Sequence, residues 1–78
     1  MPSQADDINL RFGQVVRQYR GQAGLSQEEL ADAAGLHRTY VSLLERGLRN
    51  PSLHVILMLA GALGVSAVQL LADIEQQR

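Results

Sequence analysis

The segment Gln27–Arg46, QEELADAAGLHRTYVSLLER, holds two short runs of apolar residues at helical spacing, with Gly35 between them. Apolar residues three or four apart lie on the same face of a helix. Glycine adopts the positive φ of a helix end at little cost, so Gly35 predicts a turn between two short helices. The two runs consist of Leu30, Ala31 and Ala34, and of Leu36, Val41 and Leu44.

The spacing of small, glycine, β-branched and leucine residues in this segment is typical of a helix-turn-helix unit. The fifth position is small, the ninth is glycine, the fifteenth is β-branched and the eighteenth is leucine: Ala31, Gly35, Val41 and Leu44. Apolar residues also occupy the fourth, eighth and tenth positions. A small fifth residue lets the second helix cross the first closely. The alternative is an ordinary helical hairpin with a glycine turn.

The composition indicates one small all-α domain over residues 1–78, with an ordered part of about 6–75. Apolar residues make up 46% of the chain, which is too many for a disordered segment. Leucine, alanine and valine dominate and only three residues are aromatic, which favours helices. We therefore expect a core made mainly of aliphatic side chains on packed helices.

Cysteine usage and the N-terminal sequence exclude several classes of protein. The chain has no cysteine, so it forms neither a disulfide nor a thiolate metal site. Its two histidines, His37 and His54, do not indicate a metal site, and no residue pattern indicates catalysis or a cofactor. The apolar run Leu53–Leu63 is too short to span a bilayer. With no signal peptide evident, we expect a cytoplasmic protein that is not an enzyme and has no membrane partner.

Charge is distributed unevenly along a chain whose net charge is −1. Six arginines and four acidic residues lie between Arg11 and Arg49, whereas one arginine and four acidic residues lie outside this range. A basic middle with acidic ends predicts a single face that binds an anion such as DNA. All seven basic residues are arginine, whose geometry suits phosphate and guanine.

Helix signals divide the chain into five predicted helices. Ser26 with Glu29 forms a capping box at the start of the second helix. The fourth helix has two candidate caps, Ser52 and Asn50. The first helix has a stripe expected to be buried: Phe12, Val15, Val16 and Tyr19. The predicted ranges are about Ile8–Gln22, Gln27–Ala34, His37–Arg46, Leu53–Leu63 and Ala67–Ile74.

The last two predicted helices carry more apolar residues than one packing face needs. The core side is expected to use Leu53, Ile56, Leu57, Ala60 and Leu63 in the fourth helix and Val68, Leu71 and Ile74 in the fifth. The remaining apolar residues then predict a homodimer interface. This interface comprises Val55, Met58, Leu59, Ala62 and Leu70. Alternatively, a domain this small needs every apolar residue for its own core.

The second helix of the helix-turn-helix unit is expected to enter the major groove of double-stranded DNA with its N-terminal end. Arg38 is expected to hold guanine through two hydrogen bonds, although a solvated charge is the alternative. The candidate base contacts are His37, Arg38, Thr39 and Ser42. The candidate phosphate contacts are Gln27, Tyr40, Arg46, Arg49 and Arg17. Arg11 is a weaker phosphate candidate, and His37 is equally well a helix-start or phosphate residue.

The chain resembles the lambda-repressor-like (Cro/C1, XRE) family of DNA-binding domains over about Phe12–Leu71. The similarity lies in LSQEELADAAGLHRTYVSLLERGLRNPSL and in the later LAGALGVSAVQLL. Within the family, HRTYVSLLERG followed by RNPSL is most similar to controller proteins of restriction-modification systems, which are small dimeric regulators of their own operon. Small antitoxins and phage regulators share most of this pattern.

The resemblance implies roles for several residues. It implies an ion pair between Arg20 and Glu45, a phosphate contact by Gln27, and base contacts by His37, Arg38, Thr39 and Ser42. Matching positions in some activating phage repressors contact RNA polymerase, and here they hold Glu28 and Asp32. Acidic residues near a helix N-terminus are also favourable without any partner.

These observations predict a transcriptional regulator that binds, as a homodimer, a DNA site with two-fold symmetry. Its half-site centres should lie roughly 34 Å apart, or a multiple of this distance. Because the net charge is slightly negative, nonspecific binding should be weak and specificity should depend on base contacts. The alternative function is an antitoxin or a protein-interaction module with the same fold.

Overall fold

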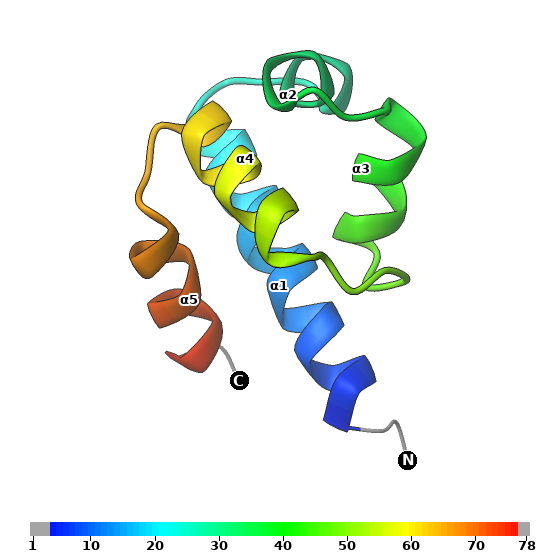
Figure 1. Ribbon diagram of the computed structural model, residues 1–78, viewed down its shortest axis with the longest axis vertical. Helices are drawn as coiled ribbons and strands as arrows, with labels where there is room; N and C mark the ends of the chain where they lie inside the picture. The colour runs from blue at the N-terminus through cyan, green and yellow to red at the C-terminus, as the bar shows by residue number, and fades with distance from the viewer. Residues whose placement is uncertain (1–3, 77–78) are drawn as a thin grey trace.

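The computed structural model describes residues 4–76, and side chains from residue 7 onward (Figure 1). This part of the chain forms five helices and no strand, which confirms the predicted all-α class. The sequence predicts that residues of about 6–75 are ordered. Residues 1–3 and 77–78, which fall outside that range, also lie outside the described residues. The helices are α1 (Gln4–Gln22), α2 (Gln27–Ala34), α3 (Arg38–Glu45), α4 (Leu53–Leu63) and α5 (Ala67–Gln76).

Helix α1 is the central element of the fold. It contacts α3, α4 and α5, while α2 packs against α3 and α4, and α4 packs against α5. In Figure 1, α3 and α5 lie on opposite sides of α1 and α4. The α2–α3 unit and helix α5 therefore face different sides of the molecule.

Local capping explains where the helices begin and end. The Ser26 hydroxyl accepts a hydrogen bond from the Glu29 backbone N–H at 3.0 Å, and the Glu29 carboxylate accepts one from the Ser26 N–H at 2.9 Å. The predicted capping box is therefore present. Ser52, rather than Asn50, caps α4, because its hydroxyl accepts from the Val55 N–H. Compared with the predicted ranges, α1 begins earlier, α5 ends later, and α3 is one residue shorter at each end.

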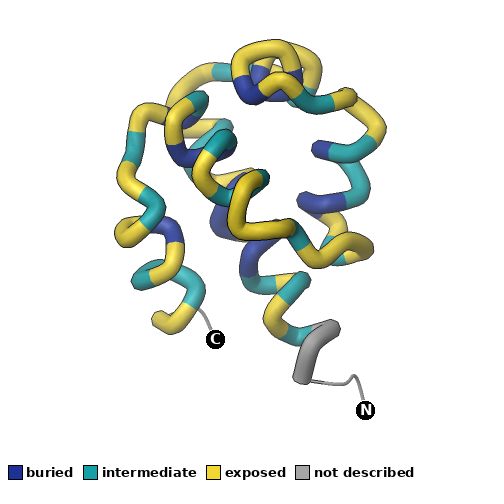
Figure 2. Tube along the Cα trace, in the orientation of Figure 1, coloured by how far each residue is buried: buried dark blue, intermediate teal, exposed yellow. Residues whose placement is uncertain are grey.

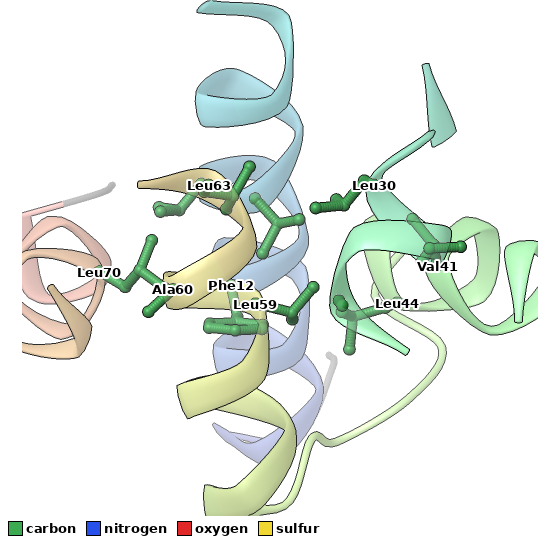
Figure 3. Close-up of a cluster of buried hydrophobic side chains, with 12 residues drawn as sticks. Phe12, Leu30, Val41, Leu44, Leu59, Ala60, Leu63 and Leu70 are labelled. Carbon is green, nitrogen blue, oxygen red and sulfur yellow. The ribbon is translucent and has the colours of Figure 1, made fainter. Parts of the chain in front are cut away.

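A cluster of buried aliphatic side chains and one phenylalanine forms the core between the helices (Figure 3). The predicted stripe of α1 contributes Phe12, Val15 and Val16, with Tyr19 half-buried. Figure 2 shows the buried segments facing inward and the exposed segments facing outward. The remaining buried members are Leu30, Ala31, Ala34, Val41, Leu44, Leu59, Ala60, Leu63 and Leu70.

Polar contacts attach helix α5 to helix α1. The Tyr19 hydroxyl donates a hydrogen bond to the Asp73 carboxylate, which raises the pKa of Tyr19 above its ordinary value. Arg11 forms an ion pair with Asp7 at 2.6 Å, and its Nη1 donates to the Ile74 carbonyl at 3.4 Å. Arg11 therefore serves the contact between these two helices.

The predicted inward faces of α4 and α5 are wrong in part. Leu59 and Leu70, expected on the dimer face, are 0% exposed and belong to the core of the single chain. By contrast, Leu53, Leu57, Val68 and Leu71, expected inside, are 70%, 55%, 75% and 44% exposed. Helix α4 is apolar around most of its circumference, so its periodicity does not select one inward face. Its orientation is set by packing against α1, α2 and α5.

No single helix within residues 4–76 is long and apolar enough to cross a membrane. Helices α4 and α5 have the necessary length and composition only when taken together, and the chain bends by 103° between them.

Candidate nucleic-acid interface

The turn between α2 and α3 has the geometry that the sequence predicts. Gly35 adopts the left-handed conformation with φ of 71° and ends α2. The Leu36 N–H then donates to the Ala31 carbonyl at 2.8 Å, which closes the turn. The backbone of His37 is extended, and α3 begins at the next residue. This tight turn presents the N-terminal end of α3 at the surface.

The predicted base-contacting residues lie together at the start of α3. His37, Arg38 and Thr39 are exposed, and Ser42, one turn later, is half-buried. His37 occupies the N-cap position, but its side chain makes no capping hydrogen bond and remains available to a ligand. The opposite side of α3 is buried through Val41, Leu44 and Glu45. The helix is thus anchored on one side and accessible on the other.

The predicted phosphate-contacting residues are spread over three places. Arg46 is exposed directly after α3, and Arg49 is exposed in the following loop, where its Nη1 donates to the Leu48 carbonyl at 2.9 Å. Arg17 is exposed on α1, away from the α2–α3 unit in sequence. Tyr40 is half-buried and packs against the core. Gln27 is half-buried at the start of α2.

Ion pairs divide the arginines into two groups. Arg11 is paired with Asp7, and Arg20 is paired with Glu45. Across the side chains described from residue 7 to residue 76, the other arginines form no ion pair. These four are Arg17, Arg38, Arg46 and Arg49. Their charges remain available for an anionic partner, and three of them lie in α3 or the loop that follows it.

The ion pair implied by the family resemblance is present between Arg20 and Glu45. Arg20 Nε donates to Glu45 Oε2 at 2.7 Å and Arg20 Nη2 donates to Oε1 at 3.0 Å, while Nη1 donates to the Leu25 carbonyl at 2.9 Å. The side chain of Glu45 is 3% exposed and that of Arg20 is 17% exposed. The hydrogen bonds with Glu45 raise the pKa of Arg20 above its ordinary value. The pair joins α1 to the end of α3.

Other long-range contacts position the loop after α3, and no local sequence pattern predicts them. The Asn50 amide nitrogen donates to the Asn9 side-chain oxygen at 2.8 Å, although the two residues are 41 positions apart. Gly47, with φ of 77°, lies against Leu10, where an added Cβ would approach Leu10 Cα to 2.9 Å. The loop that carries Arg46 and Arg49 is therefore held against α1.

Helix α2 presents acidic residues outward. Glu28 and Asp32 are exposed, and their spacing of four residues places them on one face of the helix. Glu29 belongs to the capping box instead. The two acids expected at a polymerase contact are therefore accessible on the element that precedes α3.

The exposed start of α3, held by a glycine turn, together with the unpaired arginines of α3 and of the loop that follows it, defines a helix-turn-helix regulator of transcription. The chain belongs to the Cro/C1-type helix-turn-helix family: the family described as Helix-turn-helix matches residues 16–70. This membership confirms the predicted family.

The relatives include control proteins of restriction-modification systems. Control protein C.BamHI of Bacillus amyloliquefaciens is 51% identical over 67 residues, covering 85% of this chain and 83% of that protein. The crystal structure of the controller protein C.AhdI from Aeromonas hydrophila has a TM-score of 0.78 and 50% identity, over 80% of this chain and 94% of that chain. These similarities confirm the predicted resemblance to controller proteins.

A third relative was solved together with DNA. The tetramer of the restriction-modification controller protein C.Esp1396I, in complex with its natural 35 base-pair operator, matches with a TM-score of 0.81 and 29% identity. The match covers 88% of this chain and 91% of that chain. In that protein, the shared fold binds an operator as an assembly of several copies.

Proposed function

We propose that this chain is the controller protein of a restriction-modification system and that it binds, as a homodimer, an operator with two-fold symmetry. The observation that carries the proposal is the set of exposed Arg38 and Thr39 and half-buried Ser42 at the surface of α3. A protein-interaction module would need no cationic, hydrogen-bonding surface at this position. The similarity to C.BamHI and C.AhdI supports the controller role.

Each of the candidate base contacts has a chemistry suited to a base edge. The Arg38 guanidinium donates two parallel hydrogen bonds to guanine O6 and N7. Thr39 donates or accepts one hydrogen bond and contacts a thymine methyl group. The short Ser42 side chain lets the helix backbone approach the groove, and His37 stands at the edge of the same surface.

Contacts to the DNA backbone would fix the register of α3 in the groove. Arg46 and Arg49 follow α3 directly and clamp the phosphates beside it. The start of α2 offers a second phosphate site, which would use Gln27 and the first uncapped N–H groups of the helix. Tyr40 and Arg17 complete the proposed backbone contacts.

The proposed homodimer uses the exposed apolar residues of α4 and α5. The α4–α5 surface, defined here as Leu53, Leu57, Val68 and Leu71, replaces the predicted interface residues Leu59 and Leu70. Val55, Met58 and Ala62 are half-buried and would lie at its edge. Burying one such leucine contributes about 1–2 kcal/mol before the costs of association. Because α3 and α5 lie on opposite sides of the fold, contact through α5 leaves both copies of α3 free (Figure 1).

A shallow apolar pocket next to this surface favours a second copy as the occupant. It has a volume of about 130 Å³, well below that of typical small-molecule sites. Ile56 and Leu71 line it from α4 and α5, and Ile8 lines it from α1. A two-fold axis brings the same surface of each subunit together, so an exposed leucine of one copy can fill the pocket of the other.

The acidic face of α2 is the proposed contact with RNA polymerase. Glu28 and Asp32 are exposed, share one face, and form no ion pair among the side chains of residues 7–76. An acidic surface beside bound DNA suits a basic region of the polymerase. Charge-removing substitutions at both residues should lower transcriptional activation and leave operator binding intact.

Selection of bound duplexes from a random pool tests the main proposal. The enriched duplexes should share two inverted half-sites whose centres are roughly 34 Å apart or a multiple of this distance. Repeating the selection at two salt concentrations separates base contacts from phosphate contacts. A pool without enrichment, or with a single unrepeated half-site, would contradict the proposal.

A further inference from the structure

The side chain of Gln27 is held by a residue of another helix. Its amide nitrogen donates a hydrogen bond to Glu45 Oε1 at 3.1 Å, from the start of α2 to the end of α3. An ionised carboxylate only accepts hydrogen bonds, so the nitrogen of the amide must face Glu45. This bond uses one of the two N–H groups and fixes the plane of the amide. The second N–H group remains available for an acceptor outside the protein.

The carboxylate that holds Gln27 is almost completely removed from water. The Glu45 side chain is 3% exposed and accepts two hydrogen bonds from Arg20 in addition to that from Gln27. An unpaired buried carboxylate beside a phosphate would repel it strongly, because little water screens the two charges. The Arg20 guanidinium cancels this charge and leaves the environment of Gln27 neutral.

We propose that Glu45 is a positioning residue for DNA binding: it holds the Gln27 amide so that its free N–H group donates to a backbone phosphate, while Arg20 neutralises Glu45. This inference rests on the proposed function. It assigns a binding role to an ion pair whose geometry would otherwise be explained by stability alone. It also couples the phosphate contact of α2 to the end of α3, so the two helices keep a fixed relative position when they contact DNA.

A charge-neutral replacement of the ion pair tests the proposal without altering long-range electrostatics. Apolar residues can replace a buried ion pair with little loss of stability, whereas removing one partner is costly. The test variant is therefore Arg20→Met with Glu45→Leu. The control is Gln22→Ala, which removes an exposed glutamine at the end of α1, outside the proposed DNA and dimer surfaces.

Operator affinity is measured for five proteins: the parent, the control, Gln27→Ala, the Arg20→Met/Glu45→Leu variant, and the combination of Gln27→Ala with that variant. Loss of one oriented hydrogen bond predicts about a threefold to tenfold loss of affinity per subunit for Gln27→Ala. The ion-pair variant should lose the same factor, the combination should lose no more, and the control should bind like the parent. Full affinity in the ion-pair variant, or a full additional loss from Gln27→Ala within it, would overturn the proposal.

A second measurement applies to the parent protein and does not depend on the folding of any variant. Solvent exchange of side-chain amide protons can be followed by NMR for each glutamine. The Gln27 amide should exchange more slowly than that of Gln22, which is exposed at the end of α1. Equal exchange rates would show that Glu45 does not hold the amide and would overturn the inference. Failure of the parent to bind any duplex would instead contradict the proposed function.

Discussion

Gly13 of α1 lies directly against the main chain of Glu45 in α3. A Cβ atom at Gly13 would come within 2.6 Å of the Glu45 carbonyl oxygen and within 2.5 Å of the Leu44 carbonyl oxygen. Real Cβ atoms do not approach backbone oxygens so closely, so the missing side chain of Gly13 permits the crossing of the two helices. The same crossing allows Arg20 to reach Glu45. The position of α3, the helix proposed to enter the major groove, therefore depends on a glycine in α1.

The first prediction concerns this close approach. Gly13→Ala should destabilise the fold by about 1–3 kcal/mol, because α3 must shift away from α1. Gly21→Ala is the matched control: it lies in the same helix with no neighbouring atom within 4 Å, and it should stabilise by about 0.5–1 kcal/mol. Urea unfolding of both variants measures the effects. Equal stability of the two variants would contradict this account of the helix crossing.

The second prediction separates base contacts from phosphate contacts. Arg38→Ala should weaken operator binding by about 1–3 kcal/mol and relax the preference at one base position. Arg46→Ala should weaken binding to all sequences about equally and reduce the dependence of affinity on salt. Affinity measurements on operators with single base changes, at two salt concentrations, distinguish the two outcomes. If Arg38→Ala weakens all sequences equally, Arg38 contacts phosphate.

The third prediction concerns the dimer surface. Leu57→Glu should give a monomer, because it places a charge within the proposed α4–α5 surface. Leu48→Glu is the control, since Leu48 is equally exposed at 55% but lies in the loop after α3. Sedimentation equilibrium reports the oligomeric state of each variant. An unchanged dimer with Leu57→Glu, or a monomer with Leu48→Glu, would rule out this surface.

Leu59→Glu provides a related test of which leucines form the core. Leu59 is 0% exposed, so a carboxylate there would be buried without a partner. We expect this variant to unfold, as measured by loss of the helical circular dichroism signal, while Leu57→Glu stays folded. A folded monomer with Leu59→Glu would show instead that Leu59 faces the second subunit.

The fourth prediction concerns stability at low pH. Hydrogen bonds from the Ser26 backbone and hydroxyl hold the pKa of Glu29 below its ordinary value of 4.5. The folded protein therefore binds fewer protons than the unfolded protein as the pH approaches 4.5. The stability contributed by this group is present above pH 4.5 and is lost as the pH falls through the lower folded-state value.

Thermal unfolding over a series of acidic pH values measures this contribution. Glu29→Gln keeps an oxygen acceptor for the Ser26 N–H but cannot titrate, so its stability should fall less steeply below about pH 4.5. Glu28→Gln removes a carboxylate next to the capping box but leaves the acceptor of the Ser26 N–H in place, so it is the control for the loss of one acidic group. Identical slopes for the two variants would contradict the assigned role of Glu29.

Much of the fold could be predicted because its signals are local. The Ser26–Glu29 capping box needs only a spacing of three residues, and Gly35 marks a turn because of its own backbone freedom. The buried stripe of α1 follows from apolar residues at helical spacing. The same local logic placed Arg38 and Thr39 at the start of α3, where the structure leaves both exposed, and Ser42 one turn later, where it is half-buried.

The faces of α4 and α5 could not be predicted in this way. Leu57 and Leu59 are equally apolar and lie in the same turn of α4, yet one is 55% exposed and the other is fully buried. When apolar residues surround a helix, each rotation of the helix offers a similar hydrophobic gain. The contacts with α1, α2 and α5 decide among these rotations.

The sequence by itself determined the class of fold, the helix-turn-helix unit and the family, because these depend on residue types at short, fixed spacings. Only the tertiary structure decided which leucines form the core, which arginines remain unpaired, and that Gln27 is held by Glu45. These features join residues far apart in the chain, such as Gln27 and Glu45 or Asn9 and Asn50. Their geometry exists only when several helices pack at once, so no local pattern of residues records it.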